Sequence, residues 1–385
     1  MEENQIQISS TEQTAMPPKK KKLSARSIIA LVFSCLFLAM VSVFPIMKLC
    51  GVKPGVNYEN RPLTERPTAQ DWINDYSNAS NKFESYYNDN FPLKSTMLEL
   101  YSLFEYNIFK SSLLPNMVSI GNDGWLFLEG DGANDVRKII GGELYSLEML
   151  ESIYQGIMAK YNQLKAIGKE YIVYLAPEKQ MIYPELDRLK IAEYTVIDQV
   201  IDYLKEKNCP VPIINGADDL LVKKSLGDQL YYKFDSHWNS LGAHYGYEKA
   251  LSVVKQLFPN ANIPYAKNYQ IGKGECSGDL AGMIYLSKHL KEQTFIFDYE
   301  YKPTYESIDN YVKVSSAVQS DLKILIYGDS FVQMNYWGPC FSQSATETRI
   351  MHRRSGFGAV LQNVGESNVV IEECVQRSLS SLFLH

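Results

Sequence analysis

The chain has 385 residues, of which 45% are hydrophobic and 21% are charged, a composition typical of a globular protein and unlike that of a disordered or fibrous one. The net charge is −6, and the acidic excess lies after residue 50. Because proteins bind nucleic acid by neutralising its phosphates with Lys and Arg, this acidic body predicts no nucleic-acid partner and no anionic membrane surface as a partner.

The first feature along the chain is an apolar run of nineteen residues, from Ile28 to Ile46, without a charge. A helix of that length spans roughly the 30 Å hydrocarbon core of a bilayer, so the run predicts a transmembrane anchor over residues 27–49. A cleaved signal peptide is a weaker interpretation. The apolar region of a signal peptide is usually only about 7–15 residues long and is followed by a small-x-small cleavage site, and no such site follows this run. A buried helix of a soluble protein is disfavoured by the basic residues beside the run.

Those basic residues, Lys19–Lys22 and Arg26, precede the apolar run. A basic flank stays in the cytoplasm by the positive-inside rule. Residues 1–26 are therefore predicted to be a cytoplasmic tail, and everything after Cys50 is predicted to lie outside the cytoplasm, on a single-pass protein of the cell membrane.

Residues 50–115 are predicted to be a linker and a helical lead-in. Residues 51–70 contain three prolines and little periodicity, whereas apolar residues recur at three- to four-residue spacing over 71–110, which predicts a helix. The remaining residues, 116–385, are predicted to form the main globular domain.

Helices and strands are predicted to alternate along this domain. After a turn at 122–124, the predicted strands are 125–128, 171–175, 211–214, 321–327 and 369–371, and the predicted helices are 146–167, 194–207 and 240–257. Such alternation predicts an α/β fold with a mainly parallel sheet flanked by helices. Ligands of such sheets bind beyond the carboxyl ends of the strands.

Four cysteines follow the anchor region at wide spacing: Cys209, Cys276, Cys340 and Cys374. No C-x-x-C pattern is present, so the sequence contains no readable zinc or redox motif. Outside the cell these residues could form two disulfides, or they could be buried free thiols. Both interpretations stay open.

A candidate nucleophile follows the strand 321–327. The chain continues as Gly328-Asp329-Ser330-Phe331, where glycine permits a sharp turn and the serine can present its hydroxyl above the sheet. A helix that begins after the serine would direct backbone N–H groups at an oxyanion. The alternative is that Ser330 is only a helix N-cap.

A candidate base lies at His237. Asp235 and His237 are two residues apart, so in an extended segment both side chains point to one side, and a carboxylate there can orient the imidazole. The alternative is a surface D-x-H segment before a helix. A metal site of Asp235, His237 and His244 is a further alternative, but no other ligand at suitable spacing supports it, so no metal is predicted.

The segment Asp235–Trp238, D-x-H-W, together with Gly328–Phe331, G-D-S-F, resembles the AlgX/AlgJ-like SGNH-hydrolase family. This family comprises extracytoplasmic alginate O-acetyltransferases and their relatives, including proteins named for the sequence D-H-H-W. The resemblance extends over about residues 57–380. It implies an SGNH-hydrolase-like fold, with residues 116–385 as the catalytic domain, and a Ser–His–Asp triad of Ser330, His237 and Asp235.

Three further residues are candidates for substrate binding. Lys179 matches a family lysine near the site, with a solvated lysine as the alternative. Asn239 is a candidate oxyanion-hole donor beside the backbone N–H of Ser330. Arg353 could contact a polymer carboxylate, with a surface basic cluster as the alternative.

The predicted function is therefore a membrane-anchored extracytoplasmic O-acetyltransferase that acts on a polysaccharide through an acyl-serine intermediate, without a cofactor. The resemblance implies a multi-pass membrane O-acyltransferase as the acetyl donor. Only 55 residues follow Ser330, so the carbohydrate-binding module of one alginate enzyme is not expected, and the identity of the polysaccharide stays open. A glycan O-acetylesterase with the same triad and a non-catalytic glycan-binding or assembly subunit are the alternatives.

Overall fold

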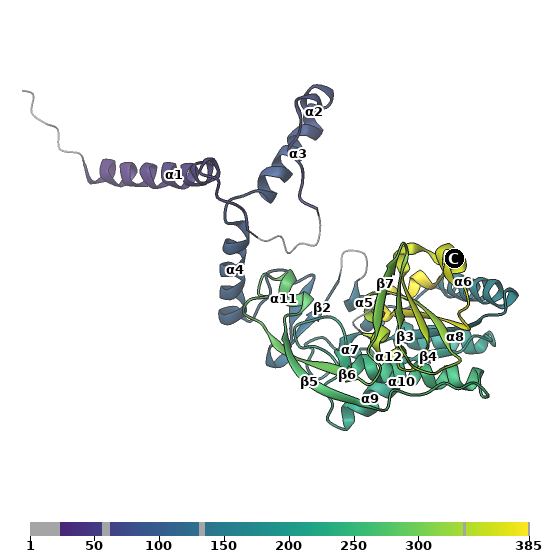
Figure 1. The fold of residues 1–385 in the computed structure, drawn as a ribbon. Coiled ribbons are helices and arrows are strands. Elements are labelled where there is room, and N and C mark those ends of the chain that lie inside the picture. Colours follow the sequence, from purple (N-terminus) through teal and green to yellow (C-terminus); the bar gives the residue numbers. More distant parts are fainter. Residues whose placement is uncertain (1–23, 56–61, 131–134, 334–335, 384–385) are drawn as a thin grey trace, which may run out of the picture. The chain divides into compact units, whose positions relative to one another are not determined.

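A computed structural model describes residues 24–55, 62–130, 135–333 and 336–383 of the chain (Figure 1). The chain forms two compact units, one of residues 1–56 and 62–94 and the other of residues 57–61 and 95–385. The basic cluster Lys19–Lys22 lies outside the described residues.

The first unit begins with helix α1, Ala25–Leu49, which contains the predicted anchor. The Ser24 hydroxyl caps it by accepting from the backbone N–H of Ser27. The helix has a mean hydropathy of 2.6 over its most apolar stretch, and none of that stretch is buried. It is therefore long and apolar enough to cross a membrane.

The helix predicted over 71–110 is divided into separate helices. The described helices of this region are α2 (Ala69–Asn74), α3 (Tyr76–Asp89) and α4 (Lys94–Phe104), and a π-helical segment at Glu105–Phe109 follows α4. Asp75 ends α2 in an extended conformation and caps α3 with its carboxylate. Pro92, which lacks a backbone N–H, lies between α3 and α4. Local capping and proline chemistry therefore override the apolar periodicity.

The second unit is an α/β domain. Its α-helices after α4 are α5 (Val136–Ile140), α6 (Leu147–Ala166), α7 (Lys179–Ile182), α8 (Val196–Glu206), α9 (Gly216–Ser225), α10 (Ser240–Leu257), α11 (Asp279–Met283), α12 (Trp337–Phe341) and α13 (Phe357–Asn363). Its strands are β1 (Val118–Ile120), β2 (Leu126–Leu128), β3 (Glu170–Ala176), β4 (Ile213–Asn215), β5 (Tyr269–Cys276), β6 (Glu292–Tyr299), β7 (Thr304–Ile308), β8 (Tyr311–Ser315), β9 (Lys323–Gly328), β10 (Glu347–His352) and β11 (Val369–Val375).

Seven of these strands form one mixed sheet in the order β4-β3-β11-β9-β10-β8-β7. The five strands from β4 to β10 are parallel. Four of them match predicted strands and β10 does not, whereas the strand predicted at 125–128 is β2, which pairs with β1 in an antiparallel sense. The β7–β8 hairpin extends the sheet in the antiparallel sense. Two further pairs, β1–β2 and β5–β6, lie outside this sheet.

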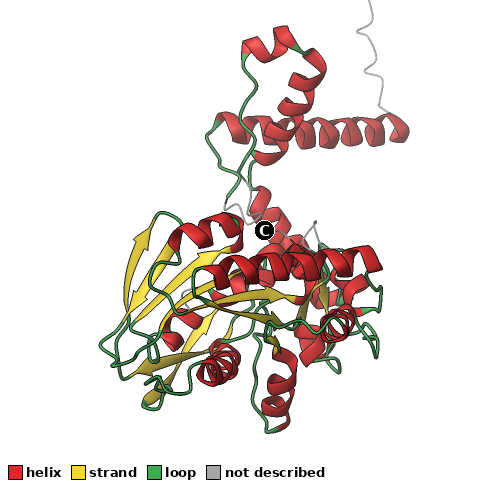
Figure 2. Cartoon of the chain, turned by 90° about the vertical axis from the view of Figure 1, so that its right-hand side faces the viewer, coloured by secondary structure: helices red, strands yellow, loops and turns green. Residues whose placement is uncertain are grey.

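Helices cover both faces of the sheet (Figure 2), and the side chains of each central strand alternate between them. In β3, Ile172 and Tyr174 pack with α9, α10 and α12 on one face. Tyr171 and Val173 pack with α6, α8 and α13 on the other face. Both faces of the central strands are therefore buried, as expected for parallel strands, and only the strand ends are free to build a site.

Candidate active site

The serine turn lies at the carboxyl end of β9, the central strand that ends at Gly328. A Cβ atom at Gly328 would lie 2.6 Å from Oε2 of Glu373, so only glycine fits this close approach to β11. The Asp329 carboxylate accepts from the backbone N–H groups of Phe331 and Val375, both at 3.0 Å. In return, Oε2 of Glu373 accepts from the N–H of Asp329 at 3.0 Å. The turn that carries Ser330 is therefore anchored to the neighbouring strand.

The histidine lies in a closed loop before α10. Tyr231 and Trp238 form an antiparallel bridge at the base of this loop, so the residues between them project as a unit. The buried Trp238 donates its indole N–H to the carbonyl of Phe331 at 2.9 Å. The tryptophan of D-x-H-W thus ties the histidine loop to the serine turn.

The structure brings together Ser330, His237 and Asp235. The hydroxyl of Ser330 lies 2.6 Å from Nε2 of His237, and Nδ1 of His237 lies 2.7 Å from Oδ1 of Asp235. The same carboxylate oxygen accepts the backbone N–H of His237 at 2.9 Å. The side chains of His237 and Asp235 are 15% and 18% exposed, so the pair is largely shielded from water but still reachable.

A second carboxylate, Asp279, supports this arrangement. Its backbone N–H donates to Oδ2 of Asp235 at 2.8 Å, and its own carboxylate accepts from the N–H and the hydroxyl of Ser236 at 2.7 and 2.5 Å. One carboxylate oxygen lies 3.7 Å from Nδ1 of His237. Position 278 must be glycine here, because a Cβ atom would lie 2.0 Å from the carbonyl oxygen of Phe234.

These contacts set the charges of the site. Burial alone lowers the pKa of His237, but the hydrogen bond and charge of Asp235, with the charge of Asp279, outweigh it and raise that pKa above its ordinary value. Burial raises the pKa of Asp235, but the hydrogen bond to His237, its charge and two backbone N–H groups hold it well below the usual range. Asp279 has a raised pKa, because partial desolvation and the neighbouring charge of Asp235 both disfavour its ionised form. The site therefore stabilises an imidazolium next to an ionised Asp235.

Lys179, predicted to bind substrate, is 1% exposed and lies beneath the histidine loop. Its ammonium group donates to the carbonyl oxygens of Asp235, Tyr232 and Lys233 at 2.6, 3.1 and 3.4 Å. Burial lowers its pKa to about 8. The lysine holds the backbone of the loop that presents Asp235.

The polar side-chain atoms of Asn239 and Arg353 are also committed to the protein. Asn239 caps α10 through its amide oxygen, and its amide N–H donates to the carbonyl of Gln229 at 2.7 Å. Arg353 contacts the Glu372 carboxylate at 2.9 Å and the carbonyl of Glu373 at 2.8 Å. The structure brings neither side chain into hydrogen-bond contact with Ser330.

His244, the third member of the alternative metal site, lies elsewhere. Its imidazole is fully buried in α10 and contacts the hydroxyl of Tyr299 at 3.1 Å. Among the described residues, the group that could offer ligand atoms to a metal is Asp235, His237 and Asp279. Their polar atoms already pair with one another or with Ser236 and Ser330, which makes the cluster a hydrogen-bonded network. All four cysteines of the domain are free thiols in this structure.

Glu373 is the buried group beneath the serine turn that sequence analysis did not single out. Its Oε1 atom has no hydrogen-bond partner among the described residues, and burial together with the charge of Asp329 raises its pKa well above the ordinary value. Its surroundings therefore disfavour the ionised form of the side chain.

The raised pKa of Glu373 predicts that the protein tolerates the substitution Glu373→Gln. An acid whose pKa is raised on folding destabilises the fold as pH rises from its unfolded pKa towards its folded one. We therefore expect the glutamine variant to lose less stability than the wild type between about pH 5 and pH 8, measured by thermal unfolding. Glu373→Ala should cost roughly 2 kcal/mol or more at either pH, because it leaves a cavity. If the stabilities of the wild type and Glu373→Gln change with pH in parallel, Glu373 is ionised in the folded protein and the prediction is wrong. The control is Glu206→Gln, a substitution at an exposed position of α8.

The comparisons with known proteins agree with this geometry. A family profile described as "SGNH hydrolase-like domain, acetyltransferase AlgX" matches residues 118–345, more than half of the chain. The chain belongs to this family. The domain described above is therefore an SGNH-like domain, and the resemblance drawn from the D-x-H-W and G-D-S-F segments is confirmed.

Individual relatives of this AlgX-family chain are distant. A probable alginate O-acetylase AlgJ from Pseudomonas syringae pv. tomato is 23% identical over 185 residues, 47% of this chain and 44% of the relative. A probable alginate O-acetylase AlgJ from Pseudomonas fluorescens is 26% identical over 181 residues, 46% of this chain and 42% of the relative. The matches thus span less than half of the length of these relatives.

Solved structures to which the chain is similar include the O-acetyltransferase domain of Pseudomonas putida AlgJ, with 17% identity and a TM-score of 0.49, over 68% of this chain and 92% of that domain. A DHHW family protein from Eubacterium siraeum has 15% identity and a TM-score of 0.47, over 68% of this chain and 92% of that protein.

Proposed function

We propose that this AlgX-family protein is an O-acetyltransferase that moves an acetyl group onto a glycan hydroxyl through an acyl intermediate on Ser330. The observation that carries the proposal is the continuous hydrogen-bonded chain from Ser330 through His237 to Asp235 at the carboxyl end of the sheet. The curated relatives named alginate O-acetylases support acetyl as the group and a glycan as the acceptor.

The proposed reaction has two steps, acylation of Ser330 and transfer of the acyl group to a sugar hydroxyl. The Ser330 oxygen attacks the acyl carbonyl while His237 Nε2 takes the hydroxyl proton, and the leaving group departs with that proton. A sugar hydroxyl then attacks the acyl-serine, His237 takes its proton, and the bond to Ser330 breaks as that proton returns to the serine oxygen. Asp235 remains ionised and stabilises the imidazolium in both steps. The backbone N–H of Ser330 is the proposed oxyanion donor.

We propose a structural role, and no substrate contact, for three of the predicted binding residues: Lys179, Asn239 and Arg353. Their polar groups hold the histidine loop, the start of α10 and the buried end of β11. We therefore assign the substrate contacts to other residues.

The proposal places the domain outside the cytoplasm, anchored by α1. Acetyl-CoA is a cytoplasmic donor, so the acetyl group must be supplied across the membrane, and we propose a multi-pass membrane O-acyltransferase as the partner that supplies it. A reporter enzyme that is active only outside the cytoplasm, fused after His385, should be active in cells. If instead a cytoplasm-only reporter is active at that position, the glycan acceptor is wrong as well.

Transfer and hydrolysis differ only in what attacks the acyl-serine. We expect the purified full chain in detergent to hydrolyse an activated acetyl ester slowly, and an added oligosaccharide to gain the mass of one acetyl group. Transfer dominates when the site holds a sugar hydroxyl near His237 and limits competing water. The measurement is mass spectrometry of the sugar together with the rate of acetate release.

Three outcomes separate the candidate functions. Acetylated sugar supports the transferase. Rapid deacetylation of an acetylated glycan, without transfer to any offered acceptor, would identify an esterase that uses the same triad. The absence of both reactions, in a protein that still binds glycan, would identify a binding subunit and overturn the proposal.

A further inference from the structure

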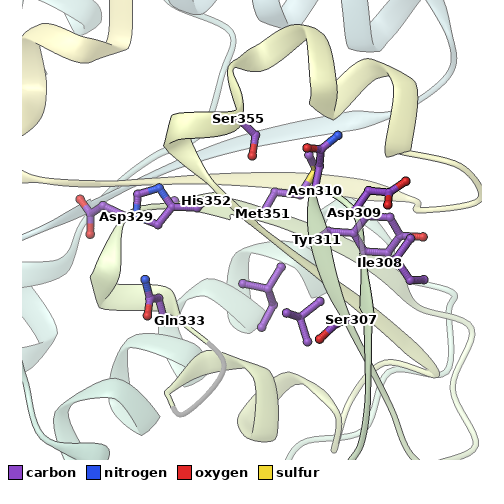
Figure 3. Close-up of a pocket in the computed structure, with 13 residues that line it drawn as sticks. Ser307, Ile308, Asp309, Asn310, Tyr311, Asp329, Gln333, Met351, His352 and Ser355 are labelled. Carbon is purple, nitrogen blue, oxygen red and sulfur yellow. The ribbon is translucent and has the colours of Figure 1, made fainter. Parts of the chain in front are cut away.

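A pocket of about 520 Å³ opens beside the serine turn, at the same edge of the sheet. Gly328 and Asp329, which precede Ser330, line it, and so does Gln333, which follows the short helix that begins at Ser330. The opposite side is the β7–β8 hairpin, with Asp309 and Asn310 at its tip (Figure 3). The volume lies in the range typical of small-molecule sites, about 300–1,000 Å³.

The strand register places this pocket close to the candidate nucleophile. Gly328 at the end of β9 pairs with His352 at the end of β10, and Met351 of β10 pairs with Tyr311 of β8. Neighbouring strands lie roughly 4.8 Å apart, so the pocket is only one to two strand widths from the serine turn. A ligand of the pocket would therefore lie next to Ser330.

The lining has the chemistry of a sugar site. Val312, Ile350 and Met351 supply apolar surface, whereas Asn310, Gln333 and Ser355 supply amide and hydroxyl groups. Amides and hydroxyls both donate and accept hydrogen bonds, as sugar hydroxyls do. A mostly apolar pocket with a few polar groups is the usual form of a small-ligand site.

The charges of the lining disfavour an anionic sugar. Its acidic members are Asp309 and Asp329, and no Lys or Arg is among the described residues that line it. Burial and the neighbouring charge of Arg354 lower the pKa of His352, which favours its neutral form. The nearby Arg353 guanidinium is committed to Glu372 and Glu373. Recognition of a carboxylate usually relies on an arginine fork or a lysine.

We infer that this pocket binds an uncharged sugar residue of the acceptor glycan, in preference to a uronate, and holds it so that one hydroxyl reaches the acyl group on Ser330. This rests on the proposed function, in which the acceptor is a glycan. The inference specifies the class of glycan that is accepted. It also assigns the selection of that glycan chiefly to residues of the β7–β8 hairpin.

The test measures binding rather than turnover. The full-length Ser330→Ala protein in detergent is titrated calorimetrically with neutral hexose or N-acetylhexosamine oligosaccharides and with uronate oligosaccharides of equal length. We expect the neutral series to bind at least about tenfold more tightly. Asn310→Trp, which fills the mouth of the pocket, should weaken neutral binding by a similar factor.

Reversing one charge tests the selection directly. Asp309→Lys, at the exposed hairpin tip, should shift the preference roughly fivefold towards uronates, the size expected for an exposed charge pair. Glu206→Lys makes the same charge change at the end of α8, which leads into β4 and so lies at the other edge of the sheet. This control should leave the preference unchanged.

Equal or tighter binding of uronates to the Ser330→Ala protein, or neutral binding that Asn310→Trp leaves intact, would overturn the inference. A failure of the proposed function is a separate result. If the wild type releases acetate but transfers none, the transferase fails while the binding preference and its response to Asp309→Lys still decide the role of the pocket.

Discussion

Ser330→Ala should abolish acyl transfer, with a fall of roughly three orders of magnitude or more in the rate of acetate release from an activated ester. The hydroxyl is the group that lies 2.6 Å from His237 Nε2, and alanine leaves no atom that can carry the acetyl group. Mass spectrometry of wild-type protein mixed with the ester should detect one added acetyl on the peptide that contains Ser330. The alanine variant should show none.

The matched control for this change is Ser225→Ala. Ser225 is exposed at the end of α9, and its hydroxyl donates only to the local carbonyl of Val222. It should react as the wild type does. A Ser330→Ala protein that still becomes acetylated and still transfers would assign the nucleophile to another residue.

Asp235→Asn should lower the transfer rate by roughly three to four orders of magnitude while leaving Ser330 in place. The asparagine cannot stabilise the imidazolium, and its amide N–H can force the wrong tautomer on His237. Acetate release is the measurement, and Asp202→Asn, an exposed change on α8, is the control. A loss of less than about tenfold would show that Asp235 does not orient the base.

The same variant should move the pH dependence in a known direction. His237 must be neutral to take a proton, so activity rises as pH passes through its pKa, which Asp235 raises. Burial lowers the pKa of His237, and Asp235 is the main group that raises it. Asp235→Asn should therefore lower this pKa, and the acidic limb of the pH–rate profile should shift to lower pH. Asp279→Asn should produce a smaller shift of the same sign.

The raised pKa of His237 should also make the stability of the fold depend on pH, but here the protonated form is the favourable one. The wild type gains stability from protonated His237 below its ordinary pKa, and loses that gain as pH rises through the raised value. Asp235→Asn should lack this contribution. Thermal unfolding across that interval therefore checks whether the rate effect and the stability effect arise from one hydrogen bond.

Much of the α/β core could be predicted because its signals are local. The helix predicted at 240–257 is α10, and the strand predicted at 171–175 is the centre of β3. Each carries its own cap, apolar period or buried run. The turn before Ser330 and the D-x-H spacing are local as well, so the sequence by itself identified the two segments that carry the candidate triad.

What only the tertiary structure decided involves partners distant in the chain. Strand β7 is largely exposed and β8 is mostly half-buried. Both strands are only five residues long, and the place of the hairpin beside β10 depends on pairing with a strand that begins more than thirty residues later. The contacts of Asp279 with Asp235 and of Glu373 with Asp329 also join separate segments. A sequence pattern reports which face of an element is apolar, but the packing of the sheet decides which strand ends meet. For that reason the sequence named Ser330 and His237, which lie 93 residues apart, and only the fold brought their atoms to 2.6 Å.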